Sequence, residues 1–169
     1  MTLAAYSTLA NLHASLDAYL ASTLADTEGL ALVRHGVARF IPPSAAAWVA
    51  VRFDELAGER RFYRQVTSSQ VGTEVQGVLR LCVLQQTRLW DTRYTLTSAR
   101  DAVVKHFPES GLIPLKDYSE RGAEAASQVG VLLLDGLEET LVDDGRQSGL
   151  IQHEIRVRCR YLDVVSAPA

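Results

Sequence analysis

Two scarcities limit the class of protein before any motif is considered. Only two cysteines occur among the 169 residues, Cys82 and Cys159, and their wide separation favours buried free thiols over a disulfide framework. A bridge stays possible only if their strands are neighbours. Apolar stretches such as residues 131–134 and 78–84 are far shorter than the ~20 residues of a membrane-spanning helix, and Arg80 interrupts the second. Neither a disulfide-stapled secreted domain nor a membrane span is predicted.

The sequence also lacks an excess of charge of one sign. Seventeen basic and 20 acidic residues give a net charge of −3, which disfavours a free-standing nucleic-acid-binding protein. The first residues lack the basic start and continuous apolar stretch of a secretory leader, so function in the cytoplasm is expected. The hydrophobic fraction of 47% is typical of a globular domain with a real core.

Signatures of catalysis and of metal binding are missing as well. The four histidines fall in different predicted elements without metal-ligand spacing, and His153 is interpreted as a hydrogen-bonded histidine at the edge of the core. No glycine-rich phosphate loop precedes a helix. The acidic residues near the end of the chain are interpreted as a solvated face and turn; they are Glu138, Glu139, Asp143 and Asp144. We therefore expect no enzyme activity, no cofactor and no metal.

Hydrophobic periodicity predicts two helices. Between Tyr6 and Leu24, leucines recur at steps of three and four residues, and Gly29 marks the end of that helix. A second helix is predicted over residues 92–107, where Leu96, Ala99, Val103 and Phe107 form a stripe that Pro108 terminates. Each helix has one apolar side to bury.

Alternating patterns predict four strands, over residues 48–53, 75–86, 129–134 and 151–161. The strand at 75–86 is apolar on both sides, which indicates a central position in a sheet. In the last strand, apolar residues alternate with Arg156, Arg158 and Arg160, so one side is core and the other is basic.

The order α-β-β-α-β-β predicts one α+β domain over residues 1–169, with a mainly antiparallel sheet and two helices packed on one face. Long loops are expected at about residues 54–74 and 109–128, and a short tail at residues 164–169. Loops of that length are commonly functional or ordered by partners.

Two groups of arginines are the candidate interface or lumen residues: Arg60, Arg61 and Arg64 in the polar segment, and Arg156, Arg158 and Arg160 in the last strand. In one interpretation they form a solvated sheet face paired with acidic neighbours. In the other they meet carboxylates of a partner subunit or line a passage for a phosphate backbone, for which the guanidinium fork is well suited.

Several segments together resemble the tail terminator proteins of long-tailed bacteriophages. They are Arg39-Phe40-Ile41-Pro42-Pro43, the strand Trp48 to Phe53, Val75 to Leu81, a helix ending in Phe107, and His153 to Tyr161. The likeness covers most of residues 6–163 and rests on the order of the elements, because the long segments at 59–74 and 109–128 match no fixed family motif.

The resemblance implies a structural virion protein located in the tail neck and present in the host cytoplasm during assembly. Such proteins form a homo-oligomeric ring, usually of six subunits, that caps the head-proximal end of the tail tube and stops its polymerisation. The implied partners are the tail tube protein and a head-completion or connector protein. DNA would pass through the lumen without sequence-specific binding.

Two alternatives stay open at this point. One is a head-side connector or tail-completion protein of the neck, because such proteins share small α+β folds and long arms. The other is a small ligand-binding or enzymatic domain that uses His153 or the acidic turn.

Overall fold

The computed structural model describes residues 9–34, 46–55, 61–67, 70–86, 92–118, 128–144 and 149–166. The helices are α1 (Leu9–Leu20), which continues directly into the π-helix η1 (Ala21–Thr27), and α2 (Thr92–His106). The strands are β1 (Ala31–Arg34), β2 (Ala47–Glu55), β3 (Arg61–Thr67), β4 (Gln70–Gln86), β5 (Ser110–Lys116), β6 (Gln128–Asp144) and β7 (Leu150–Ser166). No helix in these ranges is long and apolar enough to cross a bilayer.

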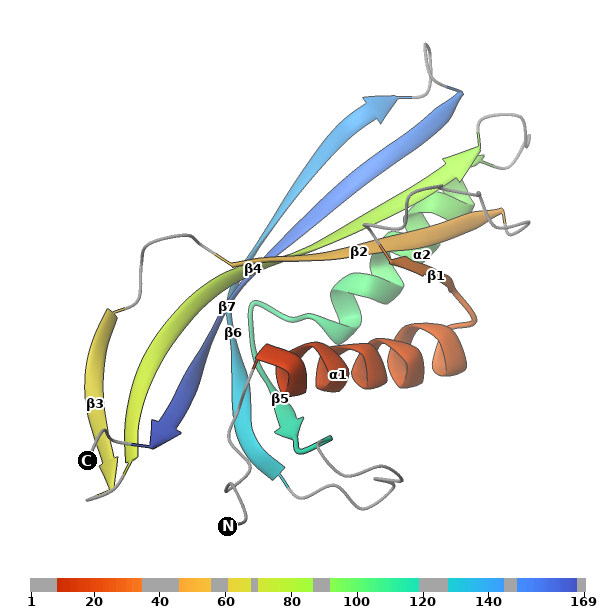
Figure 1. The fold of residues 1–169 in the computed structure, drawn as a ribbon. Coiled ribbons are helices and arrows are strands. Elements are labelled where there is room, and N and C mark those ends of the chain that lie inside the picture. The colour runs from red at the N-terminus through yellow and green to blue at the C-terminus, as the bar shows by residue number, and fades with distance from the viewer. Residues whose placement is uncertain are drawn as a thin grey trace.

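All seven strands form one curled sheet in the order β1-β2-β4-β7-β6-β5, with β3 paired to β4 beyond the end of β2 (Figure 1). The β1–β2 pair is parallel and the other pairs are antiparallel, so the sheet is mixed. Both helices lie on the same side of it. We call this side the inner face and the opposite side the outer face. The predicted α+β class is confirmed.

The inner face is built by strict alternation along the strands. On β2, β4 and β7, alternate residues such as Val49, Leu81 and Ile155 are fully buried on the inner face, and their cross-strand partners lie on the same side. The predicted central position of residues 75–86 is confirmed, because β4 lies between β2 and β7.

The helices close the core. In α1 and η1, the residues Leu12, Leu16, Leu20 and Leu24 are at most 3% exposed, and they pack with the apolar strand residues in one cluster. The predicted stripe of α2 is confirmed, since Ala99, Val103 and Phe107 join the same cluster. The two helices therefore bury the inner face as the periodicity predicts.

The first helix widens into its π-helical segment where hydroxyl side chains compete for backbone carbonyls. Thr23 Oγ1 donates to Tyr19 O at 2.6 Å, and Thr27 Oγ1 donates to Ser22 O at 2.8 Å. Gly29 ends the segment with φ of +68°, and its N–H donates to Ala25 O at 3.0 Å. Gly29 was predicted to mark this end.

The predicted element order is wrong in detail, because three strands are added to it. Strand β1 lies between the first predicted helix and the strand predicted at residues 48–53, where no element was predicted. Strand β3 and the start of β4 occupy most of the expected 54–74 loop, and β5 occupies residues 110–116 of the expected 109–128 loop. Strand β7 also extends to Ser166, within the expected tail. Residues 56–60, 68–69 and 119–127 lie outside the described part of the chain.

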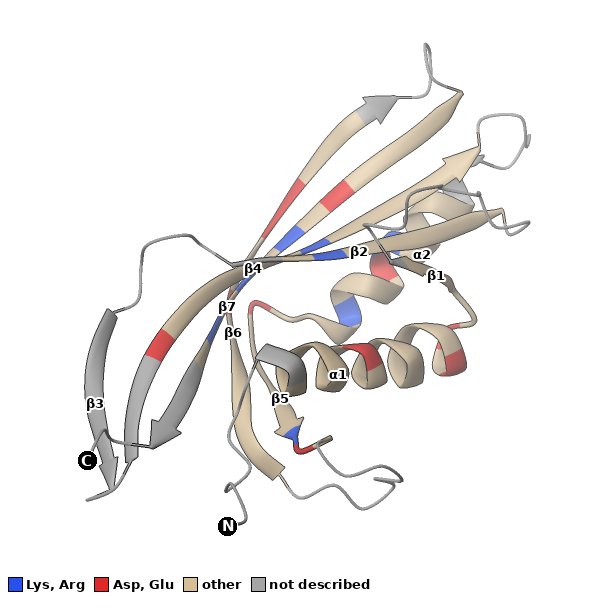
Figure 2. Ribbon diagram, in the orientation of Figure 1, with Lys and Arg blue, Asp and Glu red and all other residues tan. Residues whose placement is uncertain are grey.

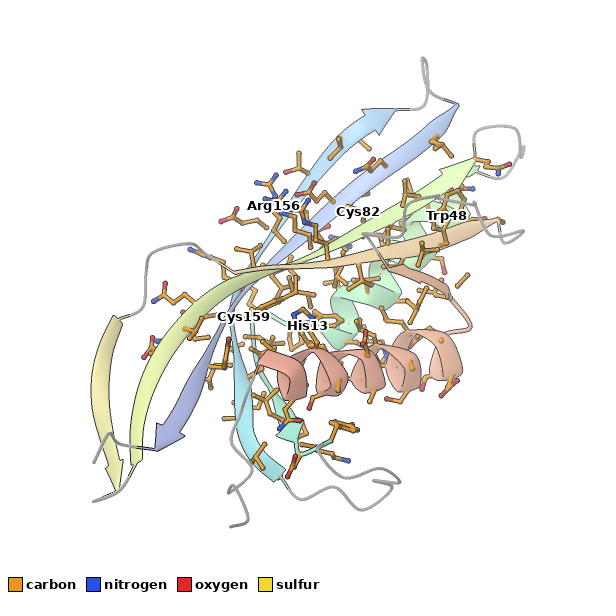
Figure 3. The ribbon with its side chains drawn as sticks, viewed as in Figure 1. His13, Trp48, Cys82, Arg156 and Cys159 are labelled. Carbon is orange, nitrogen blue, oxygen red and sulfur yellow. The ribbon has the colours of Figure 1, made fainter. Side chains whose placement is uncertain are left out.

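The two cysteines lie on neighbouring strands but on opposite faces of the sheet. Cys159 is opposite Gly77 in β4 and belongs to the inner core, where its Sγ donates to Gly77 O at 3.3 Å. Cys82 is opposite Glu154 and belongs to a small outer-face cluster with Trp48. Both thiols are free and buried (Figure 3), so the bridge that neighbouring strands would have permitted does not form.

Candidate functional site

The outer face carries a row of arginines that runs across the strands. Arg52 in β2 is opposite Arg80 in β4, and Arg80 is opposite Arg156 in β7. The next residue in the row, in β6, is Glu138. Figure 2 shows this basic band where the strands cross the middle of the sheet. Like charges directly opposite one another destabilise a sheet, so the row needs carboxylates close by.

Carboxylates of the same chain lie beside each of the three predicted arginines of β7. Arg156 Nε donates to Glu154 Oε1, and Glu154 is only 8% exposed. Arg160 Nε lies 3.2 Å from Asp135 Oδ2, and Arg158 Nε lies 3.9 Å from Glu138 Oε1. The hydrogen bond to Glu154 raises the pKa of Arg156. This face is therefore mixed in charge and does not form a continuous basic surface.

The second predicted group of arginines lies farther along β4. Arg61 and Arg64 are on β3, opposite Glu74 and Gly72 in β4, and the same two β4 residues pair on their other side with Leu162 and Val164 of β7. Arg60 lies outside the described residues. The two predicted groups are thus separated by β4, and Arg160 marks the side of the β7 group nearest to β3.

Arg52 and Arg80 were not among the predicted interface residues. Each is a single arginine within an apolar strand, so neither forms a run or a motif. The alternation of each strand does place them opposite to Val51 and Leu81, which are core residues. That signal identifies the face, but the register that aligns them with Arg156 is a tertiary feature.

The inner face has a separate polar cluster that joins side chains of α2, β6 and β7. Arg100 donates from Nε and Nη2 to the two oxygens of Glu139, at 2.6 and 2.5 Å, and His153 Nε2 lies 3.0 Å from Glu139 Oε2. Arg100, followed by His153, holds the pKa of the Glu139 carboxyl below its ordinary value, although burial opposes this shift. His153 is therefore a hydrogen-bonded histidine at the core edge, as predicted. Arg100 binds both oxygens of Glu139, the carboxylate that would have to orient His153 if it were a catalytic histidine.

A cavity of about 310 Å³ lies between α1 and β5. Its polar atoms have structural partners: Ser15 Oγ accepts from Lys116 N at 2.8 Å, and nearby Asn11 Oδ1 accepts from Tyr118 N at 3.0 Å. Asn11 and Ser15, at 6% and 4% exposure, thus satisfy outward-facing amides at the end of β5. The described ranges contain no group of three or more His, Cys, Asp or Glu side chains that could hold a metal ion.

Comparison with known proteins defines the fold and leaves the function to be inferred. No protein-family model matches the chain, and no curated protein matches it in sequence. A solved structure is similar over 96% of this chain and 99% of its own, with a TM-score of 0.56 and 13% sequence identity. At that identity the similarity establishes a shared fold and carries no function with it.

Proposed function

We propose that this chain is a tail terminator: a structural protein that assembles with copies of itself into a ring on the head-proximal end of a phage tail tube. In this role it stops tube polymerisation and joins the tail to the head. The proposal extends to its location in the virion neck and to passage of DNA through the ring without sequence-specific contacts.

The observation that supports the proposal is the arrangement of the segments that resemble the family. Trp48 to Phe53 lies in β2, Val75 to Leu81 in β4 and His153 to Tyr161 in β7, and these three strands are neighbours in the sheet. The helix that ends before Phe107 packs on the inner face of the same strands. The resembling segments within the described residues therefore lie together at the centre of one folding unit, and residues 39–43 lie outside the described part of the chain.

The long strands supply a second line of support. The first residues of β4, 70–74, pair with β3 on one side and with the end of β7 on the other. This three-stranded arm extends past the helices (Figure 1). Arms and exposed strand ends are suitable material for contacts between subunits. We propose that one face of the ring copies the docking surface of the tube subunit and the other does not, so the next layer of tube cannot add.

The outer-face arginines have a restricted role in this proposal. Because Arg156, Arg158 and Arg160 each lie near a carboxylate of the same protomer, they are better suited to exchange ion pairs with a neighbouring subunit than to attract a phosphate backbone. Passage of DNA then depends on the absence of specific contacts and needs no basic lining.

The experiment is tail assembly with and without this chain, followed by electron microscopy of the particles. Overlong tails in its absence, restored to normal length by the wild-type protein, are the expected result. Filled heads with separate tails of normal length would assign the chain to the head-side connectors. Joined particles with tails of normal length in its absence would overturn the proposal.

A further inference from the structure

Exposed apolar side chains are concentrated on two strands. Among the described residues, the exposed large hydrophobic side chains all belong to β5 or β6; they are Leu112 (63%), Val131 (36%), Leu133 (38%), Leu141 (56%) and Val142 (52%). Single exposed apolar residues are ordinary on a protein surface, but residues grouped on one part of it mark an interaction site.

Three of these residues form a contiguous patch on the outer face. Leu112 is directly opposite Leu133, and exposed Pro114 is directly opposite Val131. Their neighbours along the strands, Ile113 and Leu132 among them, are buried on the inner face, so the patch faces away from the helices. We call these four residues, Leu112, Pro114, Val131 and Leu133, the β5–β6 patch.

The other two residues lie at the opposite end of β6. Leu141 is opposite His153 on the inner face, and Val142 follows at an irregularity of the strand. We call Leu141 and Val142 the β6 tip. Eight residues separate Leu133 from Leu141, which corresponds to roughly 25 Å along a strand. Figure 1 shows the two ends of β6 at opposite extremes of the molecule.

The two sites cannot contact each other within one protomer, and they differ in shape and in face. A twofold dimer would bring a patch against its own copy, whereas two different sites at opposite ends suit a head-to-tail contact. The charges next to them also differ: Lys116 is exposed at the end of the β5–β6 patch, and Asp143 and Asp144 follow the β6 tip in the sequence.

We infer that the β6 tip of one copy docks on the β5–β6 patch of the next copy. Leu141 and Val142 pack against Leu112, Val131 and Leu133, and the backbone end of β6 comes near the end of β5 at Lys116. This contact is heterologous, so its repetition gives a ring when the rotation closes. The inference rests on the proposed function for the need to form a ring, and it names the surfaces that form it.

The first test blocks each site separately. Leu133→Asp and Leu141→Asp are each expected to abolish assembly, because every copy of a given variant lacks the same one of the two sites that each contact needs. Each variant alone should sediment as a monomer, whereas an equimolar mixture should form dimers and nothing larger. Ser98→Asp, at an exposed position of α2 outside both sites, is the matched control and should assemble like the wild-type protein.

The second test identifies the contact by oxidative cross-linking. Leu133→Cys and Leu141→Cys should form a disulfide-linked dimer when mixed, and neither should do so alone. The native thiols do not compete: both are buried, and burial raises the pKa of Cys159 to about 12. The wild-type protein treated with the same oxidant is the control, and it should form no disulfide-linked dimer.

Three outcomes would overturn the inference. The first is cross-linking of Leu133→Cys with itself, which indicates a twofold contact, and the second is the formation of wild-type-sized oligomers by both Asp variants. The third is a wild-type protein that stays monomeric while the mixed cysteine variants fail to cross-link. Circular dichroism of each variant distinguishes loss of contact from loss of fold. The proposed function is judged separately by tail length, so rings that form through these sites without limiting tails would contradict the function and leave the inference standing.

Discussion

The inner and outer faces are formed by the same strands, but they are held together by different interactions. On the inner face, Leu79 and Leu81 are fully buried, and each buried apolar side chain of this size contributes about 2 kcal/mol or more. On the outer face, between them along β4, Arg80 joins a row of charges. Exposed ion pairs contribute at most about 1 kcal/mol each. Apart from the small outer-face cluster around Trp48 and Cys82, stability therefore resides on the inner face, and the charged part of the outer face is left free to specify contacts.

The largest expected effect tests this difference directly. Leu81→Ala should lower the free energy of unfolding by about 3 kcal/mol, because it leaves a cavity in the closely packed inner face. Leu133→Ala, on the outer face, should lower it by about 0.5 kcal/mol or less. Chemical denaturation measures both. Equal losses from the two variants would refute the assignment of stability to the inner face.

A smaller loss of folding stability is expected from a substitution at Gly136, at an irregularity in the pairing of β6. Leu134 and Leu137 pair with Cys159 and Val157, so β6 contains one extra residue at this point, and Gly136 has φ of +112°. A Cβ on Gly136 would lie 2.8 Å from Arg158 Nη2. Gly136→Ala should therefore destabilise the fold by about 2 kcal/mol.

Two controls separate backbone strain from steric crowding at Gly136. Gly29→Ala, at φ of +68° with no atom within 4 Å of the new Cβ, should cost only about 1 kcal/mol. Introducing Gly136→Ala into an Arg158→Ala background removes the crowding alone. Because the Arg158 side chain is flexible, most of the loss should persist there, and complete recovery would contradict a strained backbone.

Ion pairs on the two faces give a third, smaller contrast. Glu139→Gln removes the carboxylate that Arg100 and His153 share on the inner face, and it should cost up to about 1 kcal/mol. Glu138→Gln removes a carboxylate that is 3.9 Å from Arg158, with both side chains about 60% exposed, and should have no measurable effect.

The contribution of Glu139 also depends on pH. Its pKa in the folded protein is lowered below 4.5, chiefly by Arg100, so its stabilising effect is fully present above that value and is lost as the pH falls through the folded pKa. The difference in unfolding free energy between wild-type protein and Glu139→Gln should therefore shrink between pH 7 and pH 3. A difference that grows on acidification would exclude this ion pair as its cause.

The smallest effect on stability is expected from the outer face itself. Replacing Arg158 and Arg160 with Ser should leave the thermal midpoint nearly unchanged, because both side chains are partly or largely exposed. Arg156 is kept in this variant, because its loss would leave the nearly buried carboxylate of Glu154 without its partner. The same variant should weaken ring formation if these residues exchange ion pairs between subunits. Unchanged assembly would return them to a solvated, structural role.

Local patterns predicted the regular parts of the fold and missed the irregular ones. The alternation in residues 75–86 and 151–161 was strong enough to identify β4 and β7, and leucine spacing identified α1. By contrast, β5 contains Gly111 and Pro114, which are typical of loops. It can still be a strand because β5 lies at the edge of the sheet, where a residue without an N–H is tolerated.

The candidate surfaces were predicted only in part, for a related reason. Arg156, Arg158 and Arg160 were visible because they alternate within a single strand. Arg52 and Arg80 were not, because their alignment with Arg156 depends on the pairing of three strands. The exposure of Leu133 was likewise hidden, since apolar residues in a predicted strand are expected to be buried, and Leu112 lies in a segment that was predicted to be a loop.

The sequence by itself determined which side of each strand and helix is apolar, since that follows from periods of 2 and 3.6 residues within a short segment. Only the tertiary structure decided which strands are neighbours, and hence that three arginines form a row and that Cys82 and Cys159 lie on opposite faces. The physical reason is the separation in sequence between the residues that interact. The hydrogen bond from Cys159 to Gly77 joins residues 82 positions apart, and its register is set by packing of the whole inner face.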